Sequence, residues 1–203
     1  MNYLEAMIVL FAVVDPLGNL PIFLDVTENL GPSDSKKAFN SAVLVGLITL
    51  LIFTFAGKQI LTGIFHIGIE DISIAGGLLL VVIAIDNLFG SKFSRISSLK
   101  QPVGAYELGA VPLGVPLLAG PGAMVTSLTI LEKSGPFVTL TSIIVVFVFT
   151  WVMVLFVDPI HKFLGRLVSQ VFSKVMSLFI AAIGIHMALN GITTFVRQLA
   201  AQH

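Results

Sequence analysis

Long apolar runs with almost no charged residues dominate this sequence. Four runs contain no Asp, Glu, Lys or Arg, and two more contain one carboxylate each. An α-helix needs about 20 mostly apolar residues to cross a hydrocarbon core roughly 30 Å thick, so each run is long enough to span a membrane. The uncharged runs are residues 38–57, 108–131, 134–157 and 175–196; the others are residues 6–24, which contain Asp15, and residues 72–91, which contain Asp86.

The runs are continuous, and this pattern indicates helices rather than a β-barrel. Lipid offers backbone groups no hydrogen-bond partner, so only helices and closed barrels cross it, and barrel strands alternate apolar with polar residues. The charged fraction of 11% is far below the average of soluble domains, which is about a quarter. We therefore expect an all-α membrane protein, with a lipid bilayer as partner and one domain over residues 1–203. The six predicted transmembrane helices lie near residues 4–24, 38–57, 73–90, 108–131, 138–157 and 175–196.

The basic residues are distributed unevenly between the connectors of these helices. The first, third and fifth connectors carry eight Lys and Arg residues, and the opposite side carries three. Short loops rich in Lys and Arg stay in the cytoplasm, so we expect a multi-pass protein of the inner (cytoplasmic) membrane with both termini outside. The eight are Lys36, Lys37, Lys92, Arg95, Lys100, Lys162, Arg166 and Lys174; the three are Lys58, Lys133 and Arg197.

Clusters of proline and glycine interrupt the first and fourth predicted helices, and the third and sixth helices close on similar residues. Because each half would contain three helices, the halves, about residues 1–91 and 104–203, should insert with opposite orientation. This 3+3 inverted-topology repeat, with broken helices 1 and 4, is the plan of many secondary transporters, whose sites lie at the repeat interface. The clusters are Asp15-Pro16-Leu17-Gly18-Asn19-Leu20-Pro21 and Pro112-Leu113-Gly114-Val115-Pro116 followed by Ala119-Gly120-Pro121-Gly122; the closing residues are Leu88-Phe89-Gly90 and Leu189-Asn190-Gly191.

The first cluster contains Asp15, the deepest carboxylate associated with a helix break. A charged side chain at membrane depth costs at least about 2.5–3.5 kcal/mol on insertion scales, and such residues usually have a function. Asp15, Gly18 and Asn19 are therefore candidates for binding a substrate or coupling ion. Alternatively, Asp15 and Asn19 cap the half-helix that follows the break, where these residue types are favoured; the two roles are compatible.

The second cluster has no charge and offers backbone groups instead. Gly120 and Gly122 allow a close backbone approach, and amides at the N-terminus of a half-helix can hold an anion. Thr126 follows one turn later and adds a hydroxyl to the candidate site. The alternative is a kink that only lets helices cross.

Three further polar residues lie within predicted helices. Asp86 is a candidate coupling-ion or proton site, or else it reaches the membrane surface near Lys92. His186 shares a helix face with Asn190, and a histidine at this depth can shuttle protons. The alternative for His186 is a neutral ring that is hydrogen-bonded to a neighbouring helix.

Several of these motifs together resemble the MarC family of bacterial and archaeal membrane proteins. The resemblance runs through the whole chain in the expected order and implies six spans and kinship to the LysE-type exporter superfamily. It names no substrate, and it covers neither Asp86 nor His186. The matching motifs are Asp15-Pro16-Leu17-Gly18-Asn19-Leu20-Pro21-Ile22-Phe23, Ile74-Ala75-Gly76-Gly77-Leu78, Val111-Pro112-Leu113-Gly114-Val115-Pro116-Leu117-Leu118-Ala119-Gly120-Pro121-Gly122-Ala123 and Asn190-Gly191-Ile192.

We expect a secondary transporter or exporter of a small solute or ion, coupled to H⁺ or Na⁺. No Walker-type loop points to ATP, and no metalloprotease or serine-hydrolase motif and no cysteine nucleophile points to an enzyme. No cofactor is expected, and a formal net charge of zero gives no electrostatic basis for binding nucleic acid. A non-transporting assembly or regulatory protein and, less favoured, an intramembrane enzyme are the alternatives. A homo-oligomer is compatible with each of these functions.

Overall fold

A computed structural model describes residues 1–27, 30–64, 67–89 and 104–201, and all regular structure within these ranges is helical. Four helices are long and apolar enough to cross a membrane, namely Tyr3–Leu20, Pro32–Gly57, Pro121–Leu155 and Lys174–Gln198. The prediction of an all-helical membrane protein is thus confirmed at this level. In chain order the elements are α1 (Tyr3–Val14), α2 (Pro16–Thr27), α3 (Pro32–Gln59), η1 (Ile60–Ile64), α4 (Ile69–Phe89), α6 (Ala105–Leu108), η2 (Gly109–Leu118), α7 (Pro121–Leu155) and α8 (Val157–Ala201).

The first predicted helix is broken at a single residue. Helix α1 ends at Val14, Asp15 has left-handed backbone angles (φ 46°, ψ 59°), and α2 begins at once with Pro16. Proline suits the first position of a helix because the N–H it lacks would have no partner there. The break lies within the predicted cluster, whereas Pro21 at the end of that cluster lies inside α2.

The fourth predicted helix is interrupted over a longer stretch. Val111 and Val115 have extended backbone angles (φ −135°, ψ 119° and φ −132°, ψ 124°), because a residue that precedes proline is disfavoured in the helical region. Regular helix resumes only after Gly120, at the start of α7. The segment η2 is therefore a series of turns rather than one continuous helix.

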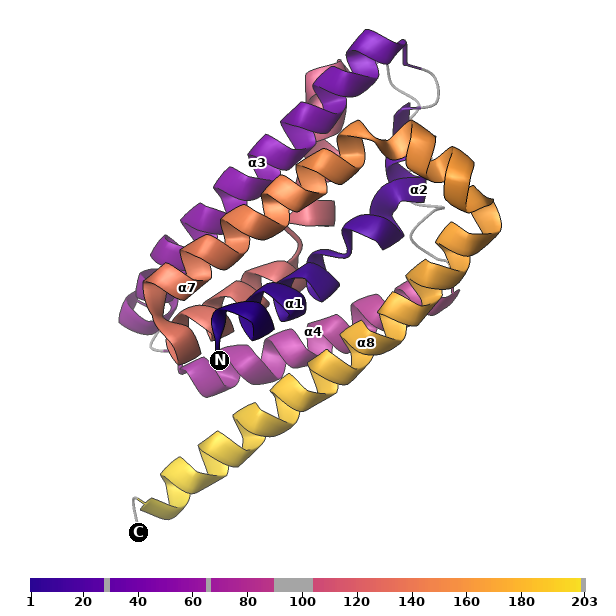
Figure 1. Ribbon diagram of the computed structural model, residues 1–203. Helices are drawn as coiled ribbons and strands as arrows, with labels where there is room; N and C mark the ends of the chain where they lie inside the picture. The colour runs from indigo at the N-terminus through magenta and orange to yellow at the C-terminus, as the bar shows by residue number, and fades with distance from the viewer. Residues whose placement is uncertain (28–29, 65–66, 90–103, 202–203) are drawn as a thin grey trace.

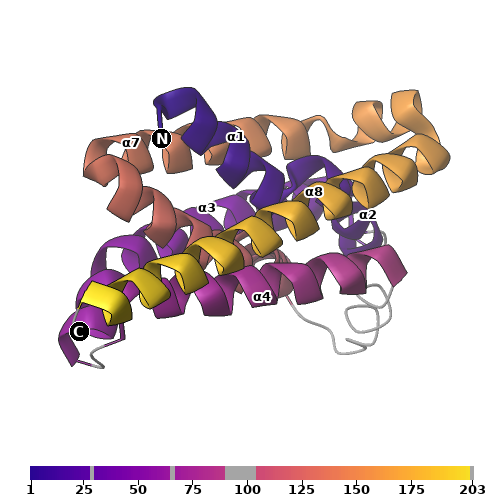
Figure 2. The same ribbon diagram turned by 90° about the horizontal axis from the view of Figure 1, so that it is seen from below.

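Helix α7 reverses direction at Gly135. This glycine has a positive φ of 81° and is followed by Pro136, and the two halves of α7 form a hairpin at one end of the bundle (Figures 1 and 2). The hairpin lies between the fourth and fifth predicted helices, near residues 108–131 and 138–157, where a connector is expected.

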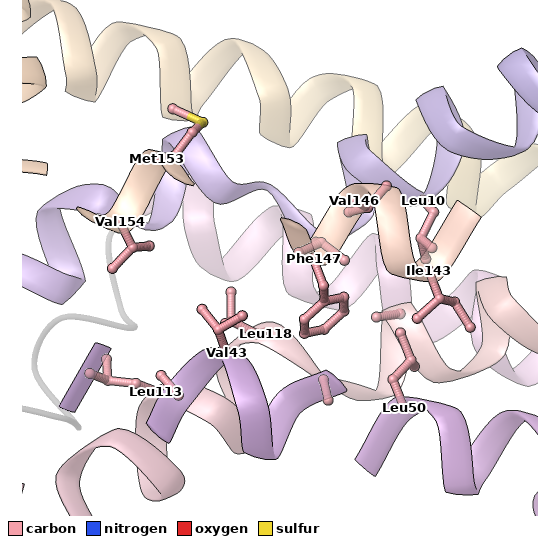
Figure 3. Packing of buried hydrophobic residues seen from close by; sticks show 14 of the residues in the cluster. Leu10, Val43, Leu50, Leu113, Leu118, Ile143, Val146, Phe147, Met153 and Val154 are labelled. Carbon is pink, nitrogen blue, oxygen red and sulfur yellow. The ribbon is translucent and has the colours of Figure 1, made fainter. Parts of the chain in front are cut away.

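Two buried clusters hold the helices together. The larger one joins α1, α2, α3, η2 and α7 and includes Leu10, Leu50, Leu118 and Phe147. Figure 3 shows Leu50 on α3 and Phe147 on α7 within this cluster. The smaller cluster joins α4, the first half of α7 and α8 through Leu80, Ala84, Val125, Ile180 and Met187.

Helices α4 and α8 pack closely and antiparallel, as Figure 1 shows. A Cβ on Gly77 would lie 2.4 Å from the carbonyl oxygen of Gly184, so these helices approach through their backbones. Near one end of the pair Lys174 Nζ donates a hydrogen bond to the carbonyl oxygen of Leu88. Small residues are the usual device for such close approach between membrane helices.

Candidate functional site at the two helix breaks

Asp15 connects the end of α1 to the start of α2 through three hydrogen bonds. Its N–H donates to the carbonyl oxygen of Phe11 at 2.9 Å, and its own carbonyl oxygen accepts from the N–H of Asn19 at 3.0 Å. Its side-chain Oδ1 accepts from the N–H of Gly18 at 3.1 Å. Asp15 therefore caps α2, as the structural alternative predicted, and this carboxylate is only 6% exposed.

Asn19 stabilises the other side of the same break. Its Nδ2 donates to the carbonyl oxygen of Val14 at 2.8 Å, which is the last residue of α1. Asn19 thus provides a hydrogen-bond donor for the last carbonyl oxygen of the preceding helix, α1. The capping alternative had predicted that it would cap the helix that follows, α2. Its side chain is 7% exposed, so two polar side chains are buried at this point.

Gly18 is required by the position of the Asp15 carboxylate. A Cβ on Gly18 would lie 2.0 Å from Asp15 Oδ2, well inside van der Waals contact. Any side chain at this position would push the carboxylate away from its bond to the Gly18 N–H. The Asp15 and Gly18 pair therefore acts as one structural unit.

The start of α7 lies beside the end of α1. A Cβ on Gly122 would lie 3.3 Å from Val13 Cγ1 and 2.4 Å from Leu80 Cδ2. Val13 is two residues before Asp15, and Gly122 is two residues after Gly120. The two helix breaks, more than 100 positions apart in the chain, are thus neighbours in the bundle.

The first turns of α7, which follow the second break, contain buried polar groups. Among the described residues no side chain caps its N-terminus, where the carbonyl oxygen of Gly120 accepts from the N–H of Met124 at 3.0 Å. Thr126 is 1% exposed, and its Oγ1 has no hydrogen-bond partner in the described part of the chain. Leaving a buried hydroxyl unsatisfied costs about 1–3 kcal/mol, so such a group calls for an explanation.

Thr54 is a buried polar residue that the sequence does not single out. Its Oγ1 lies 2.7 Å from the Oγ of Ser127, and this hydrogen bond connects α3 to α7. Both residues are 0% exposed. The one signal in the sequence is a hydroxyl inside an uncharged run, and Thr49 in the same run offers the same signal.

The remaining candidates make no hydrogen bond to the break residues in the described part of the chain. Asp86 is half-buried on α4, six residues or about 9 Å along the helix axis from Leu80; Lys92, its predicted neighbour, is outside the described residues. His186 is exposed on α8, and its Nε2 lies 3.0 Å from the Nδ2 of Asn190. This pair is formed within α8 rather than with a neighbouring helix.

No group of three or more His, Asp or Glu side chains in the described ranges is arranged to hold a metal ion. The side chains at the first break offer a carboxylate and an amide, and the second break offers backbone groups. The unsatisfied hydroxyl of Thr126 lies in the second turn of α7. Such a set suits the binding of a small polar solute or a cation.

Comparisons with known proteins agree on one family. The profile described as MarC family integral membrane protein matches residues 1–196. A UPF0056 membrane protein of Pyrococcus abyssi is 31% identical over 183 residues, which cover 90% of each chain. The UPF0056 inner membrane protein YhgN of Escherichia coli K12 is 31% identical over 198 residues, 96% of this chain and 98% of its own. No solved structure matches the chain.

Proposed function

This chain belongs to the MarC family of integral membrane proteins, and from that premise we propose that it is a secondary transporter. It would export a small solute or ion across the inner membrane and use a gradient of H⁺ or Na⁺. Its binding site would contain Asp15, Gly18, Asn19, Gly120, Gly122 and Thr126.

The observation that carries this proposal is the contact between the two helix breaks. In secondary transporters the substrate and ion sites lie where broken helices of the two repeats meet. Here the Val13 side chain lies against Gly122, since a Cβ on that glycine would be 3.3 Å from Val13 Cγ1, and both breaks are close together. The buried carboxylate of Asp15 supplies a charge at that place, and the unsatisfied hydroxyl of Thr126 supplies a further ligand.

Several features support six crossings arranged as an inverted repeat. Both termini lie at the same end of the bundle (Figures 1 and 2), which an even number of crossings requires. The reversal at Gly135 divides α7 into two helical halves. A two-fold axis in the membrane plane would relate the third helix to the sixth, and α4 and α8 pack antiparallel as such an axis requires.

The transport proposal is tested by reconstitution of the purified protein in liposomes. A panel of amino acids, organic acids and inorganic ions is offered on one side, and the flux of H⁺ or Na⁺ is recorded with trapped dyes. A substrate-dependent flux that Asp15→Asn removes supports the proposal. If no solute on the panel moves in either direction, a non-transporting assembly or regulatory role takes its place.

The proposed topology is tested separately by reporter fusions. Because basic connectors stay inside, fusions at Lys36, Arg95 and Lys162 should report a cytoplasmic location. A fusion at His203 should report an external one. A cytoplasmic C-terminus would overturn both the orientation and the inverted repeat.

A further inference from the structure

Helix α8 carries a polar stripe on an exposed face at the middle of its apolar span. The span is Lys174–Gln198, so His186 lies at its midpoint, about 18 Å along the helix from either end. Ala182, Asn190 and Thr193 lie on the same face of the helix as His186, at helical spacing. Ala182, His186 and Thr193 are exposed, and Asn190 is partly exposed.

The opposite face of α8 is already occupied. Ser177, Ile180, Gly184, Met187 and Gly191 are buried, and glycines of this face touch the backbone of α4. The exposed polar stripe therefore faces away from α4. The 33% of this span that is buried is the smallest share among the four membrane-length helices.

The hydrogen bond between His186 and Asn190 leaves two donors and one acceptor unused. If one N–H of the Asn190 amide donates to Nε2, the neutral ring carries its proton on Nδ1, while Asn190 keeps its second N–H and its carbonyl oxygen. If the amide is turned round and accepts from Nε2, both amide N–H groups and the acceptor Nδ1 remain. Neither group has a further partner in the described part of the chain, and lipid tails can supply none.

The residues beside the stripe are large and apolar. Leu178, Ile185 and Leu189 are each exposed by 51% or more. Such side chains would line a water-filled passage poorly, whereas they pack well against another membrane helix. A narrow polar stripe beside apolar residues is typical of an interface between membrane helices, where small and polar residues are concentrated.

We propose that this face of α8 binds a second copy of the same chain. Two copies in the same membrane orientation are related by a two-fold axis along the membrane normal, so their α8 helices run parallel and each residue faces its own mate. Asn190 then faces Asn190 of the other copy, so its free amide N–H can donate to the carbonyl oxygen of that mate, and the reverse. The pair is self-complementary, as a symmetric interface requires.

Single cysteines test this proposal, because the chain has no cysteine of its own. Ala182→Cys and Thr193→Cys are oxidised in native membranes, and each should give a disulfide-linked dimer because symmetry mates lie close enough for the bond. Ile192→Cys is the matched control: it is adjacent in sequence and also exposed, but it points away from the stripe. Cross-linking of Thr193→Cys that does not exceed that of Ile192→Cys would overturn the proposal.

A second measurement tests the hydrogen bonds themselves. In liposomes diluted with lipid, the double variant His186→Leu with Asn190→Leu should dissociate at a roughly tenfold higher protein-to-lipid ratio, as expected for two interhelical bonds. The single variant His186→Gln keeps a hydrogen-bond donor and an acceptor at position 186, so it should dimerise as the unchanged protein does. An unchanged dimer in the leucine variant would overturn the role of the pair. Labelling of His186→Cys by a water-soluble thiol reagent, without cross-linking along the stripe, would mark the face as a water-filled route and also overturn the proposal.

Discussion

The two helix breaks interrupt their helices with different chemistry. The first occupies one residue, and the side chains of Asp15 and Asn19 satisfy the backbone on both sides of it. The second extends from Val111 to Ala119 and uses prolines and glycines, with its last turn closed by the Ala119 N–H and the Gly114 carbonyl oxygen at 2.9 Å. One break thus supplies charge, and the other supplies shape and backbone groups. If both serve one site, their substitutions should have different consequences.

The largest effect is expected at the charged break. Asp15→Asn should abolish transport in liposomes while the protein still inserts and folds, because Asn keeps the cap and tolerates left-handed backbone angles. Asp15→Ala should also be inactive, and it should lose about 0.5–2 kcal/mol of stability with the cap. Flux normalised to inserted protein decides the point. Wild-type flux in Asp15→Asn would leave this residue with a purely structural role.

Contact between the breaks predicts a disulfide. Val13→Cys combined with Gly122→Cys should form one in membranes, because a Cβ at position 122 lies 3.3 Å from Val13 Cγ1 and only the flexible tip of Leu80 must move. Loss of labelling by a polyethylene-glycol maleimide measures the bond. The control pair replaces the second site with Ile52→Cys, which is exposed on α3 and should stay fully labelled. Equal maleimide labelling of the two cysteine pairs would show that the two breaks are not neighbours.

Glycine substitutions should distinguish the two breaks by what they damage. A Cβ on Gly120 would lie 2.5 Å from the Pro116 carbonyl oxygen, which is rigid backbone, whereas on Gly18 it meets the movable Asp15 carboxylate. Gly120→Ala should therefore cost about 1–3 kcal/mol of stability, and Gly18→Ala should reduce flux more than stability. Thermal unfolding and flux are measured together. Gly63→Ala, with nothing within 4 Å, is the control.

The smallest effect is expected away from both breaks, at the bond between α3 and α7. Thr54→Val keeps the shape of the side chain and removes the hydrogen bond to Ser127, so it should cost about 0.6 kcal/mol, the average for such bonds in a membrane protein. Thr141→Val is the control, since its hydroxyl bonds to the Phe137 carbonyl on an exposed face. A loss of stability as large as that expected for Gly120→Ala would mean that Thr54 belongs to the site.

Local rules account for the features that the sequence predicted well. The left-handed Asp15 with its capping bond lies inside the predicted cluster, since Asp-Pro and Gly restrict the backbone within a few residues. The extended Val111 and Val115 follow from the prolines that come after them, and the reversal at Gly135 falls between two predicted helices. In each case neighbours in sequence determine the conformation.

Contacts between distant segments had no such local signal. The sequence placed His186 and Asn190 among the candidates for the transport site, yet only the packing of α8 on α4 shows that this face is exposed. Many hydroxyls occur in the apolar runs of the sequence. Only the fold shows that Thr54 is hydrogen-bonded to Ser127, which is 73 positions away. Proximity of the two breaks is likewise a result of packing.

The sequence by itself determined that this chain is a helical membrane protein, where its helices break and where charge is buried. These properties depend on the length of apolar runs and on backbone restrictions at Pro, Gly and Asp, which act over a few residues. The tertiary structure decided which breaks are neighbours, which face of each helix is buried and which hydroxyls pair. Almost every residue of an apolar helix is suited equally to lipid and to protein, so hydrophobicity cannot choose a face, and close packing at a few small residues makes that choice.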